Sequence, residues 1–356
     1  MTSSSLICVT PGDPEGIGPE ICWKVARQFA AVDEKGGTTA PRLLFVGARK
    51  PFDALGARVI EVSELELLEI STGRARPPSP PPSPKGAFIW LLSAPIRAPR
   101  AFLEGFQTGW SIEKATYLVQ CGVARALVTG PISKERLRRG GYKFPGHTEF
   151  LAKLCATEKR IPEVTMMLAN EQLRVSLATT HVAIKDVPRA LTRAKIRRAV
   201  SQTILSLSQN WGITTPRIAV AALNPHAGES GLFGKEEIRM IGPEIRALRK
   251  RFKGQAEILG PLPADTLFAI NQLAPESSKY DAVVCMYHDQ GLIPVKLLDF
   301  RNTVNVTLGL PIVRTSVDHG VGFDIAGTGK ADPSSLIAAI RLAERLSHGA
   351  ASPLSR

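Results

Sequence analysis

The sequence predicts an α/β protein with a mostly parallel sheet. Two observations support this: short apolar runs rich in β-branched residues recur along the chain, and amphipathic helical stretches separate them. Strands that alternate with helices form parallel sheets through right-handed crossovers. Because 356 residues exceed the usual size of one hydrophobic core, we expect two lobes.

The predicted strands begin with the first apolar run of the chain. SLICVT (5–10) is the opening strand, and GDPEGIGPE then turns into a helix from about Pro19 to Ala30. The further strands are RLLFVG (42–47), AFIWLL (87–92), ARALVTG (124–130), VTMMLA (164–169), LRVSLA (173–178), RIAVAAL (217–223), DAVVCMY (281–287) and TVNVTLG (303–309).

A long amphipathic helix is predicted after His181. Asp186 is placed to cap it and Pro188 suits its first turn, because short polar residues favour the N-cap and proline favours the first helical position. Its apolar positions are Leu191, Ile196, Val200, Ile204 and Leu207, before Gly212 ends it. One low-complexity segment, PPSPPPSP (77–84), predicts a polyproline II surface loop insertion.

The formal charge of +13 raises the question of nucleic acid. However, the basic residues are dispersed over helical stretches such as 191–200 and 244–253, and aromatic residues make up only 6% of the chain. A base-stacking surface is therefore not indicated, and we expect no nucleic-acid partner. The charge is typical of solvated helix faces, and its positive field favours anionic substrates.

The cysteines indicate a reducing compartment. They number five, an odd count without a CxxC pair, which fits a cytoplasmic protein better than a disulfide scaffold. The N-terminal MTSSSLICVTPGD lacks the pattern of a secretory signal. The longest hydrophobic segment, FIWLLSAPI (88–96), is too short to span a bilayer, so we expect no membrane association.

Three of the six histidines each follow a short apolar run. His181 comes after LRVSLATT, His226 after RIAVAALNP and His288 after DAVVCMY. In open α/β sheets, ligands bind outside the carboxyl ends of the strands. Three imidazoles placed there can converge, and imidazole is a common ligand of divalent transition metals. The pattern predicts a metal site with coordination positions left for water or substrate.

Two aspartates lie near these histidines in the sequence. Asp265 (GPLPADTLF) and Asp289 (YHDQG) are candidates for an extra ligand, a group that orients a histidine, or a proton acceptor.

Further candidates have anion-binding chemistry. His147 and Thr148 in GHTEFLAKL stand at a predicted helix start, where Thr148 is either a helix cap or a substrate contact. The glycine-rich opening TPGDPEGIGPEI (10–21) is equally consistent with a structural turn and a ligand contact.

Downstream, Lys296, Asn305 and Arg314 occur in PVKLLDF, VNVTLG and PIVRTS. Lysine and arginine beside a strand can bind phosphate or carboxylate groups. Surface charge is the simpler interpretation of Lys296, whereas Arg314 follows an apolar run.

Taken in order, several stretches resemble the 4-hydroxythreonine-4-phosphate dehydrogenase family of vitamin B6 biosynthesis. They span about Thr10 to Asp332 and are TPGDPEGIGPEI, LVTGPISK, GHTEFLA, TTHVAIKDVP, LNPHAGESGLFGKEE, GPLPADTLF, YHDQGLIPVK and VNVTLGLPIVRTSVDHGVGFDIAGTGKAD. The insertion at 77–84 and the basic helices depart from the family without touching these motifs.

The resemblance implies an isocitrate/isopropylmalate-dehydrogenase-like fold of two α/β/α lobes, with residues 1–130 and 307–356 in the first and 131–306 in the second. It implies a homodimer and metal ligands at His181, His226 and His288. NAD or NADP and one divalent metal (Zn, Co, Mg or Mn) are the implied cofactors. The substrate contacts are His147, Thr148, Lys296, Asn305 and Arg314.

The implied reaction is oxidation and decarboxylation of 4-phosphohydroxy-L-threonine to 3-amino-2-oxopropyl phosphate. A related dehydrogenase of erythronate or threonate 4-phosphate would share the same motifs, so the sequence separates these substrates poorly. A phosphate acyltransferase resembles the same broad fold but needs no histidine-bound metal. A basic nucleic-acid-binding protein would instead cluster its charge on one face.

Overall fold

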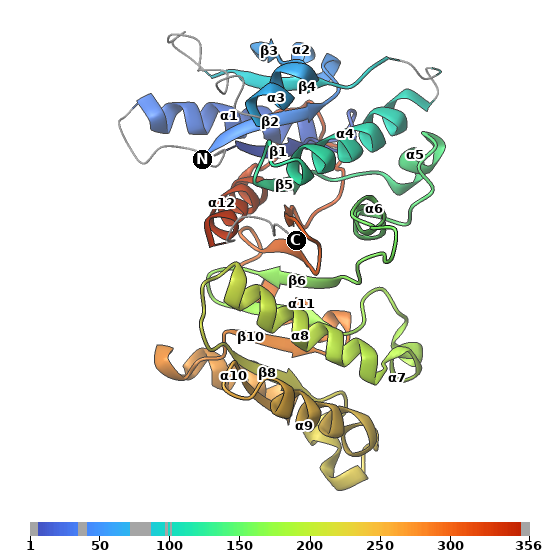
Figure 1. The fold of residues 1–356 in the computed structure, drawn as a ribbon, viewed down its shortest axis with the longest axis vertical. Coiled ribbons are helices and arrows are strands. Elements are labelled where there is room, and N and C mark those ends of the chain that lie inside the picture. Colours follow the sequence, from blue (N-terminus) through green and yellow to red (C-terminus); the bar gives the residue numbers. More distant parts are fainter. Residues whose placement is uncertain (1–5, 35–40, 72–86, 97–98, 100–101, 350–356) are drawn as a thin grey trace. The chain divides into compact units, whose positions relative to one another are not determined.

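The computed structural model describes residues 6–34, 41–71, 87–96, 99 and 102–349 (Figure 1). The chain forms two compact units: the first comprises residues up to Pro162 and Leu310–Ser347, and the second comprises Glu163–Gly309 and the chain end from His348. The sequence placed the corresponding boundaries after residues 130 and 306. The proline-rich segment 77–84 lies outside the described residues.

The first unit is built on parallel strands in the order β3-β4-β2-β1-β5-β12. Both β1 and β5 are buried along their whole length, as expected for strands with helices on both faces. The strands are β1 (Leu6–Thr10), β2 (Arg42–Gly47), β3 (Val59–Glu61), β4 (Ile89–Ser93), β5 (Ala126–Thr129) and β12 (Val313–Ser316).

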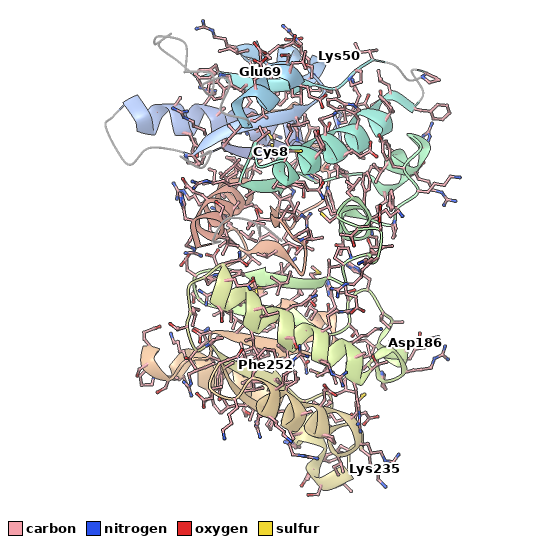
Figure 2. All side chains as sticks on the ribbon, in the orientation of Figure 1. Cys8, Lys50, Glu69, Asp186, Lys235 and Phe252 are labelled. Carbon is pink, nitrogen blue, oxygen red and sulfur yellow. The ribbon has the colours of Figure 1, made fainter. Side chains whose placement is uncertain are left out.

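Helices cover this sheet through apolar contacts. Helix α4 packs against β1, β2 and β5, and Ile112 and Leu118 on it are fully buried. Cys8 lies within the sheet (Figure 2), and burial raises its pKa to about 12, so it serves as a small apolar residue. The helices are α1 (Gly18–Glu34), α2 (Lys50–Ala54), α3 (Glu64–Ser71), α4 (Leu103–Gln120), α5 (Lys134–Arg139), α6 (His147–Leu154) and α12 (Ser334–Gly349).

The glycines of the opening segment permit close backbone packing. A Cβ on Gly12, whose φ is +88°, would lie 2.0 Å from the carbonyl oxygen of Pro131. A Cβ on Gly130 would lie 2.3 Å from the carbonyl oxygen of Pro11. The loops after β1 and β5 therefore fit together only because both carry glycine, and this packing is a structural reason for Gly12.

The second unit has strands in the order β11-β6-β7-β10-β8-β9. Only β6 runs antiparallel to its neighbours, so the predicted mostly parallel α/β fold is confirmed. Strands β6 and β7 are joined by a short turn in which Asn170 Oδ1 accepts from the amide of Leu173 at 2.9 Å, and so short a connection forces an antiparallel pair. The strands are β6 (Thr165–Ala169), β7 (Arg174–Leu177), β8 (Arg217–Ala221), β9 (Glu257–Leu262), β10 (Ala282–Cys285) and β11 (Val304–Leu308).

The long helix after His181 begins later than predicted. Asp186 is the N-cap residue of a short helix, α7 (Val187–Ala190), which contains Pro188, but the Asp186 side chain makes no capping bond. Thr192 instead caps α8 (Arg193–Gln209) by accepting from the amide of Lys195 at 3.2 Å. The prediction was wrong because an aspartate before a proline mimics a helix start.

The remaining helices of this unit are α9 (Gly242–Arg251), α10 (Ala264–Leu273), α11 (His288–Leu298) and the short helices η2 (Ile184–Asp186), η3 (Pro225–Gly231), η4 (Glu237–Ile241) and η5 (Glu276–Ser278). Among the described residues, no helix has both the length and the apolar run needed to cross a bilayer.

Candidate active site

The three histidines follow three neighbouring parallel strands of the second unit. Strand β10 pairs with β7 on one side and with β8 on the other, and all three run in the same direction. His181, His226 and His288 therefore all follow the carboxyl ends of adjacent strands. The structure places them in the topological position that the sequence predicted.

The rings of His181 and His288 lie together, with centroids 5.5 Å apart. Hydrogen bonds that continue the pairing of β7 and β10 beyond their last residues explain this proximity. The amide of Ala178 donates to the carbonyl of Cys285 at 2.8 Å, and the hydroxyl of Thr179 donates to the carbonyl of Met286 at 2.6 Å. The segments that follow β7 and β10 therefore run side by side up to His181 and His288.

Asp289 orients one of these rings. Its Oδ1 lies 2.7 Å from Nδ1 of His288. A carboxylate that accepts a hydrogen bond from Nδ1 fixes the tautomer in which Nε2 carries the available lone pair, as is usual for histidines that bind metals. Of the three roles considered for Asp289, this geometry supports the orienting one.

His226 is displayed by a left-handed turn. The φ angles of His226, Ala227, Glu229 and Ser230 are 50°, 53°, 40° and 56°, and Gly228 between them has 81°. Such angles cost roughly 1–2 kcal/mol for each residue other than glycine, so the surrounding structure must hold the turn.

The buried carboxylate of Glu237 supplies part of that support. Its Oε1 accepts from the amides of Leu223 and Asn224, both at 2.8 Å, and its Oε2 accepts from the Asn224 side chain at 2.9 Å.

The three imidazole side chains are of the chemical type that binds divalent transition metals. Two imidazoles are adjacent, and the third follows the next strand along. Among the described residues, no three histidine, cysteine, aspartate or glutamate side chains already form a group that could hold a metal ion. His226 is thus not gathered with the other two rings into a finished site.

A second polar group lies in the first unit, where three neighbouring strands each end in a residue with a hydroxyl group. Thr10, Thr129 and Ser316 are buried and occupy matching positions at the ends of β1, β5 and β12. Sequence reasoning missed these residues, although the hydroxyl that ends LICVT, ALVT and VRTS was a visible signal.

Arg314 lies within β12 and is only 3% exposed. Its Nη2 donates to the hydroxyl of Thr129 at 2.6 Å, and burial lowers its pKa to about 9. A cation taken out of water is costly, and a bound anion would offset that cost. Arg314 and the hydroxyl-bearing strand ends are therefore suited to bind an anionic group.

His147 lies at the first position of α6, near Arg314. Its Nε2 is buried and has no hydrogen-bond partner among the described residues. Burial, and after it the positive charge of Arg314, lower its pKa well below the usual value. The ring is therefore neutral at pH 7 and offers a nitrogen that a substrate oxygen can engage.

The remaining predicted site residues are Thr148, Lys296, Asn305 and Asp265. Thr148 is the second residue of α6, and Gly146 occupies the N-cap, so the interpretation of Thr148 as a helix cap is wrong. Lys296, in α11, places its ammonium 5.6 Å from the centre of the Phe300 ring. Asn305 is half-buried in β11, and Asp265 is exposed in the first turn of α10, which contacts η3.

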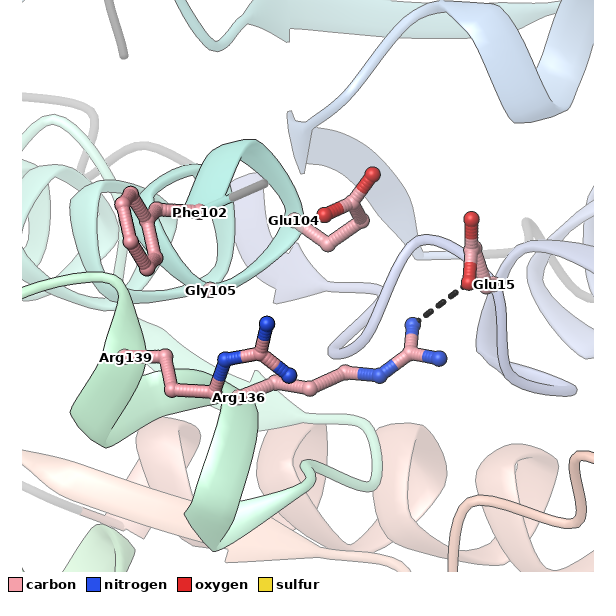
Figure 3. Close-up of a pocket in the computed structure, with 6 residues that line it drawn as sticks. All are labelled: Glu15, Phe102, Glu104, Gly105, Arg136 and Arg139. Carbon is pink, nitrogen blue, oxygen red and sulfur yellow. Dashed lines mark hydrogen bonds and ion pairs between the residues drawn. The ribbon is translucent and has the colours of Figure 1, made fainter. Parts of the chain in front are cut away.

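A pocket of the first unit lies beside the glycine-rich opening and is lined by Glu15, Phe102, Glu104, Gly105, Arg136 and Arg139 (Figure 3). Arg136 donates to Glu15 at 2.7 Å and to the buried Asp13 at 3.2 Å, and Arg139 lies 3.9 Å from Glu135. Since both arginines are paired with carboxylates, this pocket is a weaker anion site than the surroundings of Arg314.

Comparisons with known proteins show which family this chain resembles. The family model for pyridoxal phosphate biosynthetic protein PdxA matches residues 104–343. A 4-hydroxythreonine-4-phosphate dehydrogenase of Desulfosudis oleivorans is 44% identical over 354 residues, covering 96% of each chain. A D-threonate 4-phosphate dehydrogenase of Pectobacterium atrosepticum is 39% identical over 350 residues, covering 96% of this chain and 99% of its own.

Among solved structures, a 4-hydroxythreonine-4-phosphate dehydrogenase from Klebsiella pneumoniae superposes with a TM-score of 0.79. It is 36% identical and covers 97% of this chain and 100% of its own.

Proposed function

The chain belongs to the pyridoxal phosphate biosynthetic protein PdxA family, and from this membership we propose that it oxidises and decarboxylates 4-phosphohydroxy-L-threonine. The product is 3-amino-2-oxopropyl phosphate. Relatives across nearly the full chain are named dehydrogenases, so the enzyme is an oxidoreductase. The observation that carries the substrate class is the buried Arg314 beside His147, because this pair is suited to an anion.

The proposed contacts of the anionic substrate are five polar or charged side chains. In the first unit, Arg314 supplies the charge and His147 and Thr148 add hydrogen-bonding groups at the start of α6. In the second unit, Lys296 and Asn305 are the proposed contacts. Contacts that hold a bound anion in one orientation contribute to rate by positioning its reacting carbon.

His181, His226 and His288 would hold the divalent metal, for which Zn, Co, Mg and Mn are the proposed ions. Bound there, a metal supplies Lewis-acid polarisation of the substrate oxygen. The nicotinamide cofactor, NAD or NADP, supplies the hydride acceptor. Asp289 keeps His288 in its ligating tautomer throughout the reaction.

The bonds that change lie on the substrate. The C3–H bond is broken as hydride leaves, the hydroxyl proton goes to a base, and a ketone forms. Because the carboxylate is then β to a carbonyl, the C1–C2 bond breaks and carbon dioxide leaves. The electron pair of that bond passes into an enolate, which takes up a proton at C2 to give the amino ketone. Asp265 is our candidate for the proton acceptor, since it stands in the first turn of α10, which contacts the segment that carries His226.

We propose that the enzyme acts as a homodimer in the cytoplasm. Ile293 and Leu297, one turn apart on α11, are 65% and 84% exposed, and Phe300 just beyond is 69% exposed. An exposed apolar face on the helix that starts with His288 supports its burial by a second copy. The five described cysteines are free thiols, which fits a reducing compartment.

A second candidate substrate is D-threonate 4-phosphate, favoured by a relative of that name at 39% identity. It carries a hydroxyl where 4-phosphohydroxy-L-threonine carries an amino group. The test is NADH formation by the purified chain with each substrate, before and after exhaustive chelation. We expect turnover of 4-phosphohydroxy-L-threonine that chelation abolishes. Turnover of threonate or erythronate phosphate alone would overturn the substrate assignment.

A further inference from the structure

Arg136, in α5, contacts side chains from two other segments of the first unit. Its guanidinium donates to Asp13 at 3.2 Å and, as Figure 3 shows, to Glu15 at 2.7 Å, both in the loop that follows β1. Its Cζ lies 4.4 Å from the ring centre of Phe323, in the loop that follows β12. Helix α5 itself follows β5, which lies between β1 and β12 in the sheet. One guanidinium therefore connects the segments that follow three adjacent strands.

The same three strands carry polar residues of the proposed anion site. Thr10 and Thr129 end β1 and β5, and Thr129 accepts from Arg314 of β12. Ligands of open α/β sheets bind outside the carboxyl ends of the strands. The segments that Arg136 connects therefore begin where the substrate anion is expected to bind.

The three segments also contact one another through their main chains. The amide of Asp13 donates to the carbonyl of Pro131 at 3.0 Å, which joins the loops after β1 and β5. The amide of Ile17 donates to the carbonyl of Val321 at 2.8 Å, which joins the segments after β1 and β12. The Arg136 side chain adds a direct contact between the segments after β5 and β12.

A simpler role for Arg136 is that of a surface ion pair. Glu15 is exposed, and exposed ion pairs contribute little to stability. This role accounts for the bond to Glu15 but not for the other two contacts. Asp13 is only 1% exposed; burial raises the pKa of its carboxyl, and the charge of Arg136 acts against that rise. Phe323 contributes a ring from a different loop, which a surface ion pair does not require.

We propose that Arg136 is a positioning residue that holds the loops after β1 and β12, and thereby keeps the anion site around Arg314 in its binding geometry. This inference rests on the proposed function. In this role Arg136 makes no contact with the substrate. A contact that is equally strong in the bound substrate and in the transition state affects KM and leaves kcat unchanged. Distortion of the anion site should therefore raise KM.

Substitutions on both sides of the ring contact test this role. Arg136→Met removes the guanidinium at similar length, and Phe323→Leu removes the ring but keeps an apolar side chain. Arg136→Lys keeps a cation beside Asp13 but lacks the planar group that lies against Phe323. Arg138→Met is the matched control, because it removes an exposed arginine from the same helix.

The measurements are kcat and KM for the phosphorylated substrate that the unsubstituted chain turns over. Melting temperatures check that each variant is folded at the assay temperature. We expect Arg136→Met to raise KM about 10-fold and Phe323→Leu about 3-fold, with kcat within about 2-fold of normal. The double variant should have the KM of Arg136→Met alone, because both substitutions break one contact. Arg138→Met should have normal constants.

Hydrogen–deuterium exchange tests the loops without reference to activity. In Arg136→Met, exchange should become faster in residues 11–18 and 318–328, which contain the contacts of Arg136. If Arg136→Met is unfolded at the assay temperature, Arg136→Lys and Phe323→Leu decide by the same criteria.

Each outcome decides the inference. An unchanged KM, whether kcat falls or exchange becomes faster, would overturn the positioning role and leave the proposed function standing. KM effects that multiply in the double variant would mean that Arg136 and Phe323 act independently, which also overturns it. A raised KM in Arg138→Met would assign the effect to general positive charge, with the same result. If the unsubstituted chain turned over none of the proposed substrates, the proposed function would fail, and the inference with it.

Discussion

Arg314 lies close enough to His147 that, after burial, its positive charge is the second cause holding the pKa of that imidazole well below its usual value. The site therefore contains one buried cation and one neutral ring at pH 7. In the proposed substrate site, an anion would gain a charged partner from Arg314 and a hydrogen-bonding nitrogen from His147, without repulsion between two cations.

Arg314→Met should weaken substrate binding without unfolding the protein. Loss of a hydrogen bond to a charged group costs about 1.5–3 kcal/mol, so we expect KM to rise roughly 10- to 100-fold. The melting temperature should not fall, because an apolar side chain of similar length avoids the cost of burying a charge. Steady-state kinetics and thermal melting test this, and an unchanged KM would remove Arg314 from the substrate site.

The activity should decline in alkaline solution. Burial lowers the pKa of Arg314 to about 9, so the guanidinium is charged below that pH and loses its proton as the pH rises through it. We expect kcat/KM, which reports the free enzyme, to fall above about pH 9. The Arg314→Met variant should lack this decline; its persistence there would assign the decline to another group.

Substitution of His226, a proposed metal ligand, should abolish turnover and leave the fold intact. His226 lies on the surface of its turn, so His226→Ala removes a ligand without opening a cavity. The checks are NADH formation with added Zn²⁺ and the circular dichroism spectrum. Near-normal turnover would contradict its role.

Substitutions of the two aspartates should change different quantities, the Zn²⁺ affinity for Asp289 and kcat for Asp265. Asp289→Asn should weaken Zn²⁺ binding by roughly 10- to 100-fold, because it removes the carboxylate that orients His288. Asp265→Asn should lower kcat while leaving Zn²⁺ affinity normal. Equal Zn²⁺ affinities of the Asp289→Asn protein and the unsubstituted protein would show that the 2.7 Å contact has no orienting role.

Two small substitutions in the left-handed turn should change the free energy of unfolding in opposite directions. Ala227→Gly relieves a φ of 53° and should raise the free energy of unfolding by roughly 0.5–1 kcal/mol after the entropy cost of glycine. Gly228→Ala should lower it by about 1–2 kcal/mol, since φ is +81° and the new Cβ would lie 2.8 Å from Glu237 Oε2. Urea unfolding measures both, and effects of the same sign would argue against a left-handed turn.

Much of the fold could be predicted from the sequence because buried strands of a parallel sheet are short apolar runs. The strands that precede the three histidines are of this kind, and the structure confirms them as adjacent and parallel. Three strands were missed. β3 is short, β9 contains Gly260 and Pro261, and β12 reads VRTS, with an arginine inside the sheet.

The site was harder to predict, because its support comes from contacts between segments far apart in sequence. Nothing near His288 reveals that Gln290 bonds to Ala222, which lies 68 residues away. The burial of Arg314 depends likewise on the pairing of β12 with β5. Pattern reasoning identifies residues with suitable chemistry, whereas packing decides which of them become buried, charged or neutral.

The chain leaves the first unit after Pro162 and returns at Leu310, where β12 then pairs with β5 through Val313 opposite Ala126. On the ribosome, the whole of Glu163–Gly309 is therefore synthesised before the strand that carries Arg314 exists. A nascent chain can complete the sheet of the second unit first. The first unit stays without one of its strands, and without the buried cation of Arg314, until Glu163–Gly309 has been synthesised.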